Sequence, residues 1–370
     1  KNWLMSVEMN AVTNGRISND CASPRVVQRG TRSLPFFSFA RARVVHPLTL
    51  HLPFSLLPPR AHTDHAEPEQ NSNDANWNIG VGSLFAWSLG LRPAKDGFWT
   101  TPIQPGHPYS NNRSEPYGVM HGAIATLSCG PVSPADKIGL MNRTTIIRAC
   151  MEDGTLLQPD DPARPIDAQI ERIAFAATAS AGPEGEVWAT TTTVDSLYVF
   201  AHALVIDLNK SYTLTPSDLG LLPVGAEQQQ QQQQQRWIAV ENAAGHWPSH
   251  ASLYTAANGM ELSACGKSDF QLHHFSPVHA NGWALLGELE KYVPVSKQRI
   301  RAIIARTSSG EQQLEVTLRG VPGESIAIGF ACVEGTTVAS VPIVIRRVDC
   351  VFGESGSLTA SVPNGLCRDV

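Results

Sequence analysis

The sequence predicts an α/β segment followed by an all-β segment: the last strands and helices of a partial (β/α)8 barrel, and then a β-sandwich. Two observations favour the α/β segment. Residues before about 167 alternate between helical spacing and short apolar runs, and a stiff loop, residues 130–142, separates two helical stretches. The third observation favours the all-β segment, because alternating apolar and polar positions separated by turn residues dominate beyond that point.

The α/β segment contains a predicted order of helix, strand, loop and helix. Helical spacing covers residues 83–91, 115–127 and 143–151, and a short strand is expected over 98–101. The loop reads Gly-Pro-Val-Ser-Pro-Ala-Asp-Lys-Ile-Gly over residues 130–139, where two prolines stiffen the backbone. A loop after a barrel strand carries the chemistry in barrel enzymes, so we expect functional side chains here.

The all-β segment contains alternation that predicts individual strands. Strands are expected over 187–194, 197–208, 313–318 and 325–333, with a turn at 320–323 joining the last two. A run of glutamines at 228–235 is low-complexity sequence and is expected in an exposed loop.

The predicted domain organisation follows from these changes in composition. Residues 1–21 are interpreted as the end of a barrel strand and its loop, 76–166 as the closing barrel units, and 167–370 as the sandwich. Residues 22–75 are rich in Pro and Arg and hold no acidic residue before Asp64, which predicts a disordered insertion that we interpret as a gene-model artefact.

Composition excludes several classes of protein. With 42% hydrophobic and 16% charged residues, the 370-residue chain is expected to be mostly globular, and a net charge of -5 argues against nucleic acid as a partner. No run of about 18 apolar residues occurs, so a membrane partner is not expected. The seven scattered cysteines form no Cys-x-x-Cys pair, so most of them are predicted to be buried thiols. His273, His274 and His279 lack ligand spacing, so core or surface histidines are predicted rather than a metal site, and no cofactor is implied.

Three glycosylation sequons occur in the chain. They begin at Asn112, Asn142 and Asn209, and they matter only if the chain is secreted.

Three segments together carry a resemblance to a known family. Residues 15–20, the helix at 77–91 and the loop at 130–139 resemble the alpha-galactosidase and raffinose synthase superfamily of glycoside hydrolases, once the insertion is removed. Residues 153–157 and 276–287 are similar to its sandwich-side segments. The resemblance implies a catalytic barrel, a carboxyl-terminal sandwich, and hydrolysis or glycosyl transfer on α-linked sugars by two carboxylates.

The resemblance also implies roles for particular residues. Asp20 matches the general acid/base, and Arg16 would orient that acid or bind a sugar hydroxyl; the alternative for Asp20 is a solvated turn carboxylate. The second carboxylate would lie on a strand preceding Lys1. We therefore expect a carboxyl-terminal fragment that is inactive as this chain alone.

Further residues are candidates for contact with a carbohydrate partner. Asp136 and Lys137 could hydrogen-bond sugar hydroxyls or form a structural ion pair, while Trp77 and Trp99 could stack on a sugar ring or fill the core. The competing functional hypothesis is a non-catalytic carbohydrate-binding or scaffold remnant, and a third is a fragment that does not fold stably.

Overall fold

The computed structural model describes residues 88–89, 92–93, 95, 97–106, 114–175, 182–196, 198–221, 235–243, 245–248, 250–255, 259–308, 311–333 and 343–370. The chain divides into two compact units, Lys1–Asn142 (unit 1) and Arg143–Val370 (unit 2). The predicted insertion at 22–75 and nearly all of the glutamine run lie outside the described residues. The domain boundaries drawn from the sequence stay predictions.

The described part of unit 1 is built around one buried helix, α3 (Gly118–Leu127). The helix contains no Asp, Glu, Lys or Arg, and its one histidine, His121, is buried. Nine of its ten residues are buried, as expected for a helix that is apolar on all sides. Gly118 starts it because a Cβ there would lie 2.4 Å from the carbonyl oxygen of Trp99. The helix expected over 115–127 is confirmed, with a start three residues later.

Apart from Ser88, which is helical, the remainder of the described part of unit 1 is loop with isolated bridges. The strand expected at 98–101 is reduced to one parallel bridge between Phe98 and Pro134, which joins this segment to the Gly-Pro loop. Amide hydrogen bonds run both ways across the bridge, from Phe98 to Ser133 at 3.3 Å and from Ala135 to Phe98 at 2.8 Å.

Unit 2 is organised by a six-stranded antiparallel sheet in the order β1-β2-β3-β8-β5-β6. Its strands are β1 (Arg164–Pro165), β2 (Glu186–Val194), β3 (Tyr198–Ile206), β8 (Gln271–Pro277), β5 (Arg236–Glu241) and β6 (Ser252–Thr255). The strands predicted over 187–194 and 197–208 are confirmed as β2 and β3. Alternate side chains of β5 serve two cores, because successive residues of a strand point to opposite faces.

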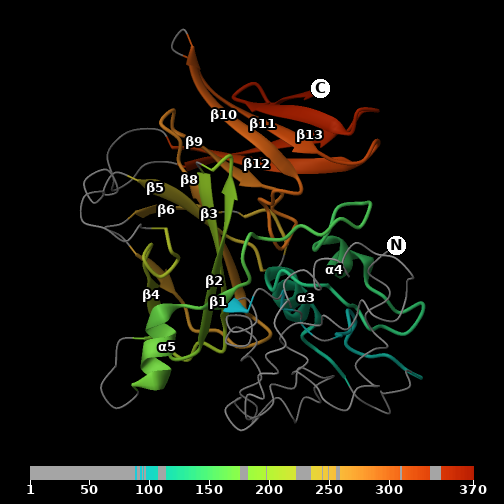
Figure 1. The fold of residues 1–370 in the computed structure, drawn as a ribbon, viewed down its shortest axis with the longest axis vertical. Helices are drawn as coiled ribbons and strands as arrows, with labels where there is room; N and C mark the ends of the chain where they lie inside the picture. Colours follow the sequence, from blue (N-terminus) through green and yellow to red (C-terminus); the bar gives the residue numbers. More distant parts are fainter. Residues whose placement is uncertain are drawn as a thin grey trace, which may run out of the picture. The chain divides into compact units, whose positions relative to one another are not determined.

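A small layer covers one face of this sheet. It comprises the two-stranded sheet of β4 (Tyr212–Leu214) and β7 (Met260–Leu262), with α5 (Asp167–Ala174) nearby in Figure 1. Tyr254 of β6 donates a hydrogen bond to the Leu214 carbonyl at 3.2 Å, which fastens the layers together. The helix α5 falls at the start of the segment predicted to be all-β, where no helix was expected. The short α4 (Arg143–Ile147) opens unit 2, so the helix expected over 143–151 is only five residues long.

Two facing sheets form the carboxyl-terminal end of unit 2 (Figure 1). One sheet has the order β13-β12-β9 and the other β10-β11-β14-β15. The strands are β9 (Trp283–Gly287), β10 (Ile300–Ser308), β11 (Glu311–Arg319), β12 (Ser325–Val333), β13 (Ile343–Val351), β14 (Ser357–Val362) and β15 (Leu366–Asp369). Both sheets contribute to one apolar core, in which Phe330 of β12 and Val316 of β11 are fully buried. The strands predicted over 313–318 and 325–333 are confirmed.

The predicted fold class is wrong. All strand pairs in the described sheets are antiparallel, whereas a (β/α)8 barrel needs parallel strands joined by helices. The described helices are few and short, and they do not alternate with strands around a barrel. The sequence pattern misled because a buried helix followed by a Gly-Pro loop has the same local spacing whether or not a parallel strand lies beside it.

Candidate functional site

The catalytic candidate from the sequence lies outside the described residues, as do two of the binding candidates. Asp20, Arg16 and Trp77 all fall in segments that the structure does not describe. Their roles stay predictions.

Asp136 lies at the centre of a hydrogen-bond cluster in unit 1. One oxygen of its half-buried carboxylate, Oδ1, accepts bonds from the amide and the hydroxyl of Thr100, each at 2.9 Å, and from the side chain of Gln104. Gln104 in turn accepts the Lys137 amide, and the exposed Lys137 Nζ donates to the Pro105 carbonyl at 2.7 Å. These bonds fasten the Gly-Pro loop onto the segment at 98–106.

Trp99 lies in the core of unit 1, with 1% of its surface exposed. Its amide donates at 2.8 Å to Glu115, and the other oxygen of that carboxylate lies 3.4 Å from Nε2 of His121. Burial raises the pKa of Glu115 to about 7, although the charge of Lys95 opposes the shift. A buried carboxyl with a pKa near neutrality can hold a proton at pH 7. The carboxyl of Glu115 is enclosed by packed side chains rather than open to solvent.

The described part of unit 2 presents an aromatic surface that the sequence did not single out. Trp247 is half-buried in the connection between β5 and β6. Its indole Nε1 donates to the carboxylate of Glu290 at 3.3 Å, and the guanidinium of Arg347 lies 4.9 Å from its ring centroid. Arg347 also donates to Asp349 at 2.8 Å. We call these four residues the Trp247 surface.

A buried arginine holds the two segments that carry Trp247 and Glu290. Arg148 donates to the carbonyls of Asn242 at 2.9 Å, Ala243 at 3.0 Å and Glu290 at 3.2 Å. Its guanidinium also lies 4.2 Å from the ring centroid of Tyr292. Because three carbonyls from two loops share one rigid cation, the loops are fixed relative to each other. We call this arrangement the Arg148 clamp.

Two neighbours extend the Arg148 clamp. The Asn242 side chain donates to the Lys291 carbonyl at 3.0 Å, and Lys291 Nζ donates to the carbonyls of Ile147 and Cys150 at 2.8 and 2.7 Å. Gly245 takes a φ of +71°, which brings the loop backbone close to the arginine. The base of the Trp247 surface is therefore preorganised by buried bonds.

Other polar side chains of unit 2 lie inside the sheets. His202 and His274 pair through their Nδ1 atoms at 2.8 Å, so one ring donates and the other accepts, and Thr192 bonds the far nitrogen of His202 at 3.3 Å. Burial lowers the pKa of His202 to about 3 and those of His273 and His279 to about 4. The sequence left core and surface placements open for His273, His274 and His279, and all three are buried.

Sequence reasoning missed the Trp247 surface because its parts are far apart in the chain. Trp247, Glu290 and Arg347 come from a loop, a turn and strand β13. The available signal was the sequence His-Trp-Pro at 246–248, an aromatic residue beside a proline between two strands.

The comparisons with known proteins give no family for this chain. No protein-family model matches it, and no curated protein matches it. Within the described residues, no helix has the length and apolar character needed to cross a membrane, and no group of three or more His, Cys, Asp or Glu side chains gathers as a metal site would.

Proposed function

We propose that this chain binds α-linked carbohydrate through the Trp247 surface. In this proposal the residues of that surface bind the sugar and do not cleave it. The observation that carries the proposal is the half-buried indole of Trp247, which packs against the core, has the guanidinium of Arg347 over its ring and donates to the carboxylate of Glu290. The part of the indole that stays exposed offers an apolar platform to the C–H face of a sugar, and the two charged groups can exchange hydrogen bonds with its hydroxyls.

The choice of sugar rests on the resemblance of the sequence to enzymes of α-linked galactosides. The choice of binding over cleavage rests on how the described charged groups are used. Asp136 and Glu115 accept bonds from the backbone and side chains of unit 1, while Arg148 and Lys291 hold loops of unit 2 together. These contacts give each of the four side chains a structural role.

The proposal is tested by titrating the full chain with the α-galactosyl sugars melibiose and raffinose, followed by tryptophan fluorescence and calorimetry. We expect Trp247→Ala to weaken binding at least about tenfold, which corresponds to about 1.4 kcal/mol. Arg347→Ala should also weaken it. Arg346→Ala is the matched control, because this neighbouring exposed arginine points to the opposite face of β13.

Two results would contradict the proposal. One is an absence of binding to either sugar by the folded wild-type chain, and the other is binding that Trp247→Ala leaves unchanged. Assaying the same mixtures for released galactose tests the enzyme hypothesis separately. If turnover appears and Asp20→Asn abolishes it, the acid/base role predicted for Asp20 gains support over a purely binding function.

A further inference from the structure

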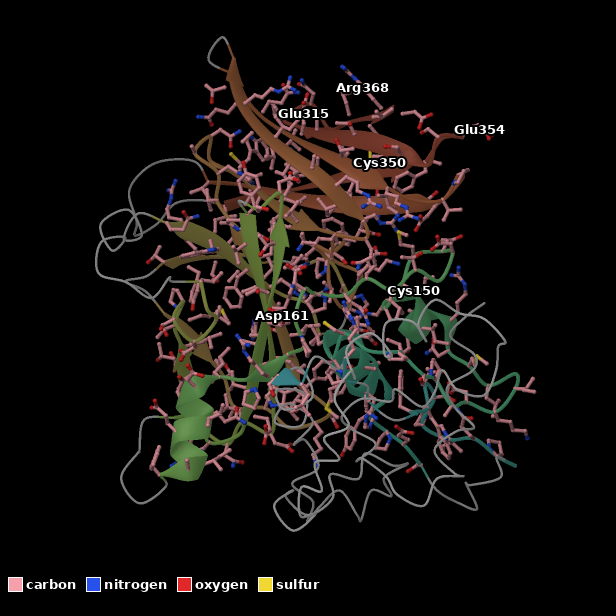
Figure 2. The ribbon with its side chains drawn as sticks, viewed as in Figure 1. Cys150, Asp161, Glu315, Cys350, Glu354 and Arg368 are labelled. Carbon is pink, nitrogen blue, oxygen red and sulfur yellow. A yellow bond between two sulfur atoms is a disulfide. The ribbon has the colours of Figure 1, made fainter. Side chains whose placement is uncertain are left out.

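The sandwich end of unit 2 is closed by a disulfide. Cys350 on β13 and Cys367 on β15 are bonded, with their Cα atoms 5.7 Å apart, within the usual span of such bridges. Because β13 and β15 belong to opposite sheets, the bond ties the two sheets together. Figure 2 labels Cys350 among these strands. Disulfides form and persist in oxidising compartments, so the bridge is informative about where the chain folds.

The other described cysteines are shielded. Cys129 and Cys150 are buried, whereas Cys265 and Cys332 are half-buried. Cys265 donates its thiol to the Val205 carbonyl at 3.7 Å. Burial raises the pKa of Cys150 and of Cys265, which keeps both as unreactive thiols. An oxidising compartment is therefore compatible with their reduced state.

A sequon matters only if the chain is secreted, so an oxidising secretory compartment makes the sequon Asn209-Lys210-Ser211 relevant. All three residues are exposed, and they lie in the connection between β3 and β4. The backbone turns just before them, at Asp207, where φ is +49°. A sequon in an exposed turn can carry a large polar glycan without displacing any packed group.

The sequon is held in place by its neighbours. The Asn209 amide donates to the Glu184 carbonyl at 2.8 Å, and Lys210 Nζ donates to the Glu184 carboxylate at 2.8 Å. Asn142 is also exposed, but it is less suited because helix α4 starts directly after it, so the rest of that sequon is helical rather than in a turn. The sequon at Asn112 lies outside the described residues.

We propose that Asn209 is an N-glycosylation site and that the chain acquires its Cys350–Cys367 disulfide in the same oxidising secretory compartment. The acceptor is the side-chain amide nitrogen of Asn209, which displaces the lipid pyrophosphate of a preassembled oligosaccharide donor and loses one proton. This inference is independent of the sugar-binding proposal.

The test is peptide mass spectrometry of the full chain purified from the cells that make it. The protein is alkylated without reduction. One part is cut before Asp207 and Asp218 by an aspartate-specific protease, which leaves the sequon whole, and is then deglycosylated enzymatically in ¹⁸O-labelled water. A second part is cut with chymotrypsin, which separates Cys350 from Cys367. We expect ¹⁸O-labelled aspartate at position 209 and a disulfide-linked peptide pair containing Cys350 and Cys367. An Asn209 peptide found only in unmodified form would overturn the glycosylation site, and alkylated Cys350 and Cys367 would overturn the oxidising compartment.

Matched variants expressed in the same cells make the test specific. Ser211→Ala destroys the sequon and should remove the mobility shift caused by deglycosylation. Ser211→Thr keeps the sequon and should retain that shift. Equal shifts in the two variants would overturn the assignment to Asn209, and the wild-type peptide decides the question even if one variant fails to fold.

Discussion

Removing the positive charge of Arg299 should destabilise unit 2 severely. Its side chain is fully buried and donates to two buried carboxylates, to Glu288 through Nε at 2.6 Å and to Glu324 through Nη1 at 2.9 Å. It also donates to the Arg319 carbonyl at 2.8 Å, and its guanidinium lies 5.3 Å from the centroid of the Phe352 ring.

The expected loss follows from what is left behind. Arg299→Met fills similar space but leaves two carboxylates, 5% and 3% exposed, without their cation. Breaking a buried ion pair from one side costs about 3–5 kcal/mol, and we expect a loss in that range at pH 7. Burial alone would raise the pKa of Glu324, but its bonds to Arg299 and the charge of Arg299 more than offset this and lower it.

The pH dependence has a definite sign. A carboxyl whose pKa is lower in the folded state stabilises the fold above its unfolded pKa, and this stabilisation is lost as the pH falls through the folded pKa. In Arg299→Met the Glu324 carboxyl can protonate instead, so the difference between variant and wild type should shrink as the pH falls from 7 toward 4.

Urea denaturation of the full chain, followed by far-ultraviolet circular dichroism, measures the effect. Arg301→Met is the matched control, since Arg301 lies two residues further along the chain, on β10, with its side chain exposed. The triple variant Arg299→Met, Glu288→Gln, Glu324→Gln should recover part of the lost stability. A loss below about 1 kcal/mol for Arg299→Met at pH 7, the level of a surface pair, would refute the reasoning.

Three further predictions concern other groups. The pKa of Glu115 is raised to about 7, so its neutral form stabilises unit 1 below pH 4.5, and this contribution falls as the pH rises through 7. Glu115→Gln should therefore reduce the difference in urea stability between pH 5.5 and pH 8. An unchanged difference would count against this prediction. Gly245→Ala should cost more stability than Gly323→Ala, because both positions have positive φ but only at Gly245 would a Cβ meet a guanidinium, at 2.8 Å; equal losses in urea would contradict this. Reducing the Cys350–Cys367 bridge, which closes a 17-residue separation, should lower the free energy of unfolding by about 3 kcal/mol, and identical urea midpoints with and without dithiothreitol would argue against it.

Local periodicity predicted four strands of unit 2, namely β2, β3, β11 and β12. Leu314, Val316 and Leu318 alternate along β11, and all three are fully buried in the sandwich core. Ile326, Ile328 and Phe330 do the same along β12. In each case one face of the strand packs against the opposite sheet, so the alternation reports burial directly.

Partner choice could not be predicted from the same pattern. The apolar run at 118–127 and the Gly-Pro loop at 130–139 fit a barrel unit, but nothing local distinguishes a parallel strand neighbour from a loop. Helix α5 was missed because it is only eight residues long. Short elements depend on tertiary packing more than on propensity.

The Arg148 clamp explains why the Trp247 surface depends on residues that would not touch a ligand. A loop that must be ordered during binding spends part of the interaction free energy on its own conformational entropy. Here the loop at 242–247 and the turn at 288–292 are already joined through Arg148. That joining required burying a cation, and burial lowers the pKa of Arg148, so the clamp carries a cost in the folded chain. Three carbonyl acceptors and the ring of Tyr292 offset it. The buried arginine thus fixes the geometry of the loop and the turn on which Trp247 and Glu290 lie.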